Sequence, residues 1–282
     1  MIKIGEKLNS SIPASGAAIA ARDEDRVLAL MERQLAAGAD YLDVNAAVCG
    51  AEEAAALLWL ARLALQRGAG LSLDSPSPAL LERVIPQLPP CALLINSLTA
   101  GGEWGNLPRL LAARGAGVVL LPLSGGKMPA SGEQRVANAE AGLTRLLDLG
   151  LSEDQVYVDI ICEALSANEQ AGAAALAAAA QLRQDHPRLH LVCGLSNISF
   201  GLPGRAYINA AFLRLARDRG LDAVICDVNS PSLAPLLQGQ ASENDGRDGA
   251  DQLAALAEDV VWGRDRHCLK FIRAFRQAFP AS

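Results

Sequence analysis

Short polar side chains follow the apolar runs of this sequence at the points where the runs end. In CGLSNISFGLPGR (193–205), an apolar run leads directly into Ser196 and Asn197, and a glycine- and proline-containing turn follows. One such residue usually caps a helix or forms a turn. Because short polar residues recur after successive apolar runs, we expect them to share one site. The set comprises Glu6, Asn9, Asp43, Asn45, Asp74, Ser75, Asn96, Ser97, Ser124, Lys127, Asp159, Glu163, Ser196, Asn197, Asp227 and Asn229.

The residue types in this set predict the chemistry of a ligand. Unpaired buried polar groups cost roughly 1–3 kcal/mol each, so gathered carboxylates and amides require a ligand with many donors and acceptors. Asp227, at the end of the eighth run, would repel a phosphate. Asp accepts hydrogen bonds from ring N–H and amino groups, and Asn both donates and accepts, so we expect a flat heterocycle rich in N–H groups. A magnesium or calcium ion on the same oxygens is the alternative.

Eight short apolar runs alternate with long amphipathic segments, and this alternation predicts the elements that position the polar residues. Runs that are apolar on both faces are typical of a parallel sheet covered by helices. Eight such units predict a (β/α)8 TIM barrel with a single domain over residues 1–282, whose active site lies at the carboxyl ends of the strands. The alternative is an open doubly wound sheet, but GEKLNSSIP (5–13) lacks the glycine-rich first turn of that fold. The predicted strands are Ile2–Gly5, Tyr41–Val44, Leu71–Leu73, Ala92–Ile95, Val118–Leu121, Val156–Val158, Leu189–Cys193 and Ala223–Cys226.

The segments between these runs predict the helices. A polar stretch rich in turn residues, Asn229–Asp251, predicts a loop after the eighth strand, with a short helix at Leu233–Leu237. The other predicted helices are Asp23–Ala37, Ala51–Gln66, Ser77–Leu88, Leu107–Arg114, Gly132–Leu149, Asn168–Asp185, Tyr207–Arg219, Gly249–Trp262 and Asp265–Phe279.

Charge and composition exclude several classes of protein. The net charge is −6 without a long basic run, which argues against nucleic acid as a partner. No apolar stretch reaches the roughly 20 residues of a membrane span, and MIKIGEK lacks the apolar core of a signal peptide. We therefore expect a soluble, cytoplasmic protein that has no membrane partner. The six cysteines form no CxxC pair and no ligand set with the three histidines, which favours free core thiols and argues against a structural zinc site.

Six short blocks resemble the pterin-binding barrel family, in the same order and each at a predicted strand end. The resemblance is greatest to the methyltetrahydrofolate:corrinoid protein methyltransferases, and it extends along nearly the whole chain. The blocks are GEKLN (5–9), LDVNAA (42–47), LDSPSP (73–78), INS (95–97), VDI (158–160) and GLSNISFG (194–201).

This resemblance implies roles for individual residues. Asp74, Asn96 and Asp159 would bind the pterin ring, and Asn197 would be the catalytic amide beside N5, the atom that carries the methyl group. Gly194 and Ser196, with Leu195, would shape the strand end against the ring. The implied rim or second shell consists of Glu6, Asn9, Asp43, Asn45 and Arg205.

The resemblance also implies the reaction and its partners. Methyltetrahydrofolate or tetrahydrofolate would be the substrate, a corrinoid protein would carry the cobalamin, and the chain would form a homodimer without a metal site of its own. Either direction of methyl transfer would use the same pocket. Phe200 and Lys127 depart from the pattern of close relatives, which affects the expected contacts of the folate tail and the corrinoid-facing surface.

Two other functions fit the same pattern. Dihydropteroate synthase shares the barrel and the pterin pocket, but it requires a basic pyrophosphate site, which RDRH (264–267) resembles only weakly. The third possibility, from another class, is a pterin-binding subunit without turnover.

Overall fold

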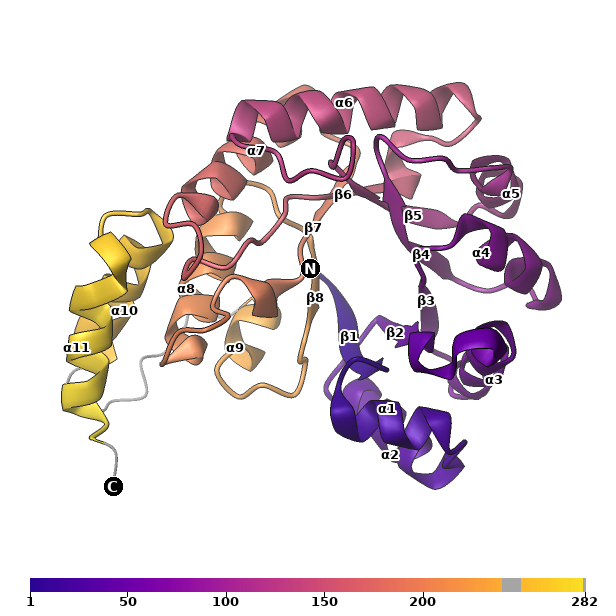
Figure 1. The fold of residues 1–282 in the computed structure, drawn as a ribbon, viewed down its shortest axis with the longest axis horizontal. Coiled ribbons are helices and arrows are strands. Elements are labelled where there is room, and N and C mark those ends of the chain that lie inside the picture. The colour runs from indigo at the N-terminus through magenta and orange to yellow at the C-terminus, as the bar shows by residue number, and fades with distance from the viewer. Residues whose placement is uncertain (240–249, 281–282) are drawn as a thin grey trace.

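Eight parallel strands follow one another around a nearly closed barrel in the computed structural model, which describes residues 1–239 and 250–280. Each strand from β1 to β6 pairs with the next, and β8 pairs with β1. Helices surround these strands on the outside (Figure 1). The predicted (β/α)8 barrel is therefore confirmed. The strands are β1 (Ile2–Asn9), β2 (Tyr41–Asn45), β3 (Gly70–Asp74), β4 (Leu93–Thr99), β5 (Gly117–Leu121), β6 (Val156–Asp159), β7 (His190–Val192) and β8 (Ala223–Cys226).

Successive side chains along each strand point to opposite faces, and the apolar ones form two separate cores. The larger core lies between strands and helices and contains Leu42 and Val44 of β2. Because successive side chains of a strand point to opposite faces, Asp43 and Asn45 face the barrel interior. A smaller core fills that interior with Ile4, Leu94, Val119, Tyr157, Val192 and Ala223.

The helices begin and end largely where the sequence predicts. Asp23 accepts a hydrogen bond from the backbone of Arg26 and caps α2, and Ser131 caps α6 by accepting from Gln134. In Figure 1, α10 and α11 stand together beside α8. The helices are α1 (Pro13–Ala20), α2 (Glu24–Ala36), α3 (Glu53–Gln66), α4 (Pro78–Val84), α5 (Leu107–Arg114), α6 (Gly132–Asp148), α7 (Ala171–Asp185), α8 (Arg205–Arg217), α9 (Ala234–Leu237), α10 (Ala250–Val261) and α11 (Leu269–Ala278).

The structure adds one α-helix relative to the prediction, extends β1 and β4 the furthest, and shortens β7 to His190–Val192. Helix α1 was not predicted, and it lies in the loop after β1. Strand β1 continues to Asn9 through a register shift between Gly5 and Leu8, and β4 continues to Thr99. In the predicted loop Asn229–Asp251, α9 matches the expected short helix, whereas residues 240–249 lie outside the described residues. No helix in the described part of the chain is both long and apolar enough to cross a membrane.

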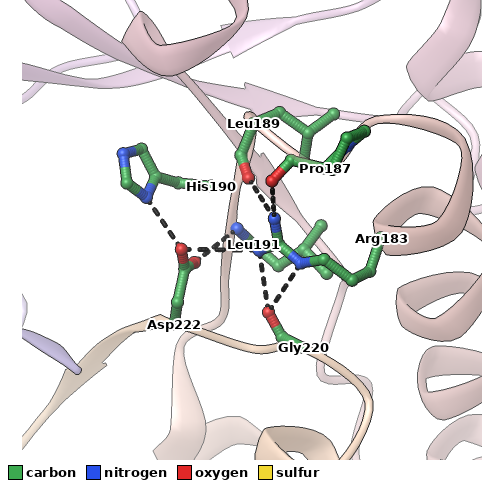
Figure 2. Close-up of polar contacts among 7 residues, drawn as sticks. All are labelled: Arg183, Pro187, Leu189, His190, Leu191, Gly220 and Asp222. Carbon is green, nitrogen blue, oxygen red and sulfur yellow. Dashed lines mark hydrogen bonds and ion pairs between the residues drawn. The ribbon is translucent and has the colours of Figure 1, made fainter.

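The junction between β7 and β8 has the sparsest backbone pairing around the barrel. An isolated bridge joins Gly194 to Ile225 there, in place of a regular ladder. The Asp222 carboxylate reinforces the junction, accepting a hydrogen bond from the backbone N–H of Leu191 at 2.8 Å and contacting His190 Nδ1 at 2.9 Å (Figure 2). A side chain thus holds together two strands that the backbone joins only weakly.

Arg183, near the end of α7, ties the same junction to the outer layer. Its Nη1 donates to the carbonyl oxygens of Pro187 and Leu189, both at 2.8 Å, and its Nη2 donates to Gly220 at 2.8 Å (Figure 2). The guanidinium also lies 3.4 Å from the Asp222 carboxylate. Because this network lies at the amino ends of β7 and β8, away from the polar strand ends, we assign it to barrel closure.

Candidate active site at the carboxyl ends of the strands

A cavity of about 420 Å³ opens at the carboxyl ends of the strands. The residues to which the family resemblance assigned a role lie on its wall with two exceptions, although they come from five strands and the segment that follows a sixth, β7. The exceptions are Leu195 and Asn45, and Asn45 hydrogen-bonds to Asp74 of the wall. The wall consists of Glu6, Asn9, Ser11, Ile12, Asp43, Asp74, Asn96, Asp159, Gly194, Ser196, Asn197, Phe200, Arg205 and Ile225.

The Asp74 carboxylate at the end of β3 is held by two amides. Nδ2 of Asn9 donates to Asp74 Oδ2 at 3.3 Å, and Nδ2 of Asn45 donates to the same oxygen at 3.2 Å. Oδ1 of Asn45 in turn accepts hydrogen bonds from the Ser10 hydroxyl and the Ala47 backbone N–H. These bonds fix the orientation of Asp74 and leave its Oδ1 without a protein partner among the described residues.

Asp43 lies deeper than Asp74 and is only 2% exposed. Its Oδ1 accepts from the Ser72 hydroxyl at 2.6 Å and from Asn96 Nδ2 at 3.3 Å. Because Asn96 donates through its nitrogen, its Oδ1 is left to accept from a ligand. The cavity wall thereby gains an acceptor at β4 beside the one at β3.

Burial changes the protonation of these carboxyl groups. Desolvation, with a contribution from the neighbouring Asp74 charge, raises the pKa of Asp43 to about 7. Desolvation also raises the pKa of Asp74 to about 6, although the Asn45 hydrogen bond opposes this change. Near neutral pH, the deep part of the cavity can therefore hold or release a proton.

Asp159 is a further carboxyl group of the cavity wall and lies at the end of β6. Its Oδ1 accepts from the backbone N–H of Ile161 at 2.7 Å, and desolvation raises its pKa to about 6. Below this loop lies Arg135 of α6, only 1% exposed, whose Nη1 donates to the carbonyl oxygens of Ile160 and Ile161 at 3.0 and 2.9 Å. Arg135 therefore supports the segment that orients Asp159.

The β7 end is braced by side chains on both flanks. The Ser196 hydroxyl donates to Glu6 Oε1 at 2.9 Å, and Nη2 of Arg205 donates to the Ser196 carbonyl at 2.6 Å. Burial raises the pKa of Glu6 despite the bond from Ser196. Asn197 follows in the same short turn, is exposed, and makes no side-chain hydrogen bond with any described residue. Its amide is free to meet a ligand.

Other polar residues at the predicted strand ends pair with neighbours and do not line the cavity. Asp227 forms a 2.8 Å ion pair with Lys7, and the backbone N–H of Asn229 donates to Asp227. Glu163 lies 3.8 Å from Arg135. Ser75, Ser97, Ser124 and Lys127 are also absent from the wall.

Sequence reasoning missed two support residues, Ser72 and Arg135, and three residues of the wall. Ser72 lies inside an apolar strand, and its position two residues before Asp74 on the same face was the available signal. Ser11, Ile12 and Ile225 join the wall through the β1 loop and the end of β8, and no chemical pattern distinguishes them.

The wall provides hydrogen-bond acceptors but no Ser–His pair and no thiol or amine nucleophile. It contains no Cys, His or Lys, and Arg205 is the only cationic side chain among its residues. No group of three or more His, Cys, Asp or Glu side chains in residues 1–239 and 250–280 is placed to hold a metal ion. The geometry suits a ligand edge rich in N–H groups, recognised by hydrogen bonds from carboxylate and amide oxygens.

Comparison with known families agrees with this chemistry. The model of the pterin-binding enzyme family matches residues 11–227, which is most of the chain. The chain belongs to this family. Membership confirms the resemblance seen in the sequence blocks and identifies the chain as a member of a family of enzymes.

Individual pterin-binding enzymes and related proteins show how far the similarity extends. A methylcorrinoid:tetrahydrofolate methyltransferase from Eubacterium limosum is 31% identical over 288 residues, covering 98% of this chain and 97% of the relative. Methionine synthase from Mycobacterium tuberculosis is 27% identical over 84% of this chain, which corresponds to 21% of that longer protein. The chain is thus similar to one relative throughout and to one part of the other.

Solved structures of this family share the fold. Dihydropteroate synthase from Thermus thermophilus superposes with a TM-score of 0.64 and 19% identity, covering 85% of this chain and 94% of that chain. The enzyme from Coxiella burnetii, solved with pteroic acid, gives a TM-score of 0.61 and 16% identity over 84% of this chain and 91% of that chain. At these identities the comparison establishes the barrel architecture alone.

Proposed function

We propose that this chain is a methyltransferase that moves a methyl group between N5 of methyltetrahydrofolate and the cobalt of a corrinoid carried by a partner protein. The observation that carries the proposal is the convergence of Asp74, Asn96 and Asp159 on one cavity, whose wall also holds Asn197, an amide that pairs with no other side chain in residues 1–239 and 250–280. The full-length similarity to a methylcorrinoid:tetrahydrofolate methyltransferase supports the choice of reaction.

The pterin-binding role of the wall follows from its unused acceptors. Asp74 Oδ1, Asn96 Oδ1 and the second oxygen of Asp159 are left over after the internal hydrogen bonds are counted. A reduced pterin presents an amino group and ring N–H groups along one edge. Each charge-assisted bond to a carboxylate contributes roughly 1.5–3 kcal/mol, so this edge would fix the orientation of the bicycle.

Asn197 would act on N5. Methyl loss from a tertiary amine creates a nitrogen anion unless N5 is protonated or hydrogen-bonded, so the leaving group needs a partner that follows its charge. An amide donates to neutral N5 through its nitrogen and accepts from protonated N5 through its oxygen. Because no described residue hydrogen-bonds to this side chain, both functions are available to the substrate.

The cavity wall holds no Cys or Lys nucleophile and no Ser–His pair, which agrees with a reaction in which the cofactor performs the difficult step. Reduced cobalt in the partner's corrinoid supplies the nucleophile for methyl removal from the folate. The protein binds the pterin edge and positions N5 toward the open end. Burial of Asp43, Asp74 and Asp159 sets the pH at which each of these side chains is protonated. The predicted homodimer and cytoplasmic location remain part of this proposal.

The deciding experiment mixes the purified chain with methyltetrahydrofolate and free cob(I)alamin and follows the cobalt absorption spectrum. We expect conversion to methylcobalamin at a rate that depends on the chain. Folate binding without a spectral change would favour the non-catalytic subunit. Formation of dihydropteroate from a pterin pyrophosphate and p-aminobenzoate would instead show a dihydropteroate synthase. The single cation among the wall residues, Arg205, argues against that activity, which requires a basic pyrophosphate site.

A further inference from the structure

Phe200 is the most exposed large hydrophobic residue in the described part of the chain, at 67%, and it lies in the wall of the cavity. Single exposed apolar residues are common on proteins, so exposure alone carries no meaning. This ring, however, stands at the rim of a cavity whose deep wall is made of carboxyl and amide groups. It therefore provides an aromatic surface at the entrance of an otherwise polar site.

The backbone that carries Phe200 is fixed on both sides. Its N–H donates to the Asn197 carbonyl at 3.1 Å, and its carbonyl accepts from the Ser166 hydroxyl at 2.7 Å. The preceding residues, Ile198 and Ser199, are fully buried. The ring is consequently presented from a rigid turn, which lowers the conformational entropy lost when a ligand packs against it.

The same wall also carries a cation, Arg205. Nε of Arg205 donates to the Ser199 hydroxyl at 3.0 Å and Nη2 donates to the Ser196 carbonyl, while Nη1 has no hydrogen-bond or ion-pair partner among the described residues. The rim thus combines an aromatic face and a positive charge, whereas the deep wall is acidic. A ligand that matches this order has an N–H-rich bicycle, then an aromatic ring, then an anionic end.

We propose that Phe200 is a specificity-determining residue that packs against the aminobenzoyl ring of the folate tail and selects tailed folates over bare pterins. This inference rests on the proposed function, because it requires the bicycle to occupy the deep wall. Arg205, fixed next to Phe200 through Ser199, would favour the carboxylates that follow the ring. Aromatic pairs prefer offset or edge-to-face contacts, which an exposed ring permits.

The test compares two ligands that share the N5-methylated bicycle, 5-methyltetrahydrofolate and the tail-less 5,6-dimethyltetrahydropterin. For Phe200→Ala, we expect the Kd of the folate to rise about 3- to 10-fold and the Kd of the pterin to stay within about 2-fold. Phe200→Tyr should retain folate affinity, and Ser166→Ala should weaken the folate selectively but less. Leu269→Ala removes another exposed apolar side chain, 58% exposed on α11, and should leave both Kd values unchanged.

Three outcomes would contradict either the role of Phe200 or the proposed function. Equal weakening of both ligands by Phe200→Ala would mean that the residue shapes the bicycle site, and the inference would be wrong. Unchanged Kd values combined with slower methyl transfer to the corrinoid protein would place the ring against the partner protein and also overturn it. Failure of the wild-type chain to bind either ligand would instead reject the proposed function.

Discussion

At the scale of single residues, the site combines carboxyl groups whose pKa burial raises to about 6 or 7 with one amide that has no hydrogen-bond partner among the described side chains. The carboxyl groups are buried and held by named donors, such as Ser72 on Asp43. Asn197 is exposed and held by none of the described residues. This contrast separates the groups proposed to bind the ligand from the group proposed to follow the charge on N5.

Replacing Asn197 should affect catalysis more than binding. We expect Asn197→Ala to lower the rate of methyl transfer by about 10²–10³, the usual effect of removing one hydrogen bond that strengthens in the transition state. The Kd for methyltetrahydrofolate and the melting temperature should change little, because the amide makes no internal hydrogen bond among the described residues. Rates from single-turnover cobalt spectra check this, with Asn229→Ala as the control for an exposed strand-end amide outside the cavity.

Folate affinity should depend on pH through Asp74 and Asp159. Burial raises the pKa of each to about 6, and ligand N–H groups favour the ionised carboxylates, so protons compete with the folate. The Kd should therefore rise as the pH falls through 6, by up to about tenfold per unit for each such group. Isothermal titration between pH 5 and 8 measures the slope.

Asp159→Asn separates this effect from protonation of the ligand itself. The asparagine Oδ1 retains the bond from Ile161, but the side chain no longer titrates. We expect weaker binding at pH 7.5 and a shallower dependence on pH below 6. A slope equal to that of the wild type would show that Asp159 does not contact the folate.

At the scale of elements, the sequence predicted all eight strands because short runs that are apolar on both faces distinguish buried parallel strands. Helix α1 was missed because PASGAAIA has little amphipathic contrast. Its Gly16 is required by a close approach, since a Cβ there would lie 2.4 Å from the Ser10 carbonyl oxygen. Such tertiary proximity leaves no periodic signal in the sequence.

The sequence predicted the candidate site wherever residue type and position at a strand end were enough to place a side chain in the cavity. Asp74, Asn96 and Asp159 meet in one cavity, as expected from the shared edge of a parallel barrel. Asp227 follows its strand in the same way, yet it pairs with Lys7. The partner of a side chain depends on distant residues, so sequence position alone could not separate these cases.

Arg135 links helix α6 to the β6 end and gives a test at this scale. Arg135→Met would leave the carbonyl oxygens of Ile160 and Ile161 without their donor and Glu163 without its positive neighbour. We expect a loss of about 2–4 kcal/mol in the free energy of unfolding, together with weaker folate binding through a loosened Asp159.

Chemical denaturation and folate titration measure the two effects of Arg135→Met. Arg114→Met is the matched control, since Arg114 also donates to a carbonyl oxygen, that of Leu88, but lies outside the cavity wall and is partly exposed. It should cost about 1 kcal/mol or less and leave folate binding intact. Equal destabilisation by the two variants would contradict a special role for Arg135.

At the scale of the whole molecule, barrel closure depends on side chains at the β7–β8 junction. Asp222→Ala removes the acceptor for Leu191 and His190 and the carboxylate beside Arg183 (Figure 2). We expect the free energy of unfolding to fall by about 2–3 kcal/mol, measured by urea denaturation. Asp218→Ala, whose carboxylate makes no hydrogen bond with the described residues, should change it by less than about 0.5 kcal/mol.

The packed interior of the barrel has a consequence for the order of events during turnover. Ile4, Leu94, Val119 and Tyr157 fill the space beneath the cavity, so the lower end gives no passage to a small molecule. In the proposed reaction, folate and carrier protein would therefore approach from the same side. The folate would have to bind before the carrier docks, and the carrier would have to leave before the folate product departs. Release of the carrier would thus be an obligatory step of every cycle, and excess carrier bound to the empty chain would act as an inhibitor.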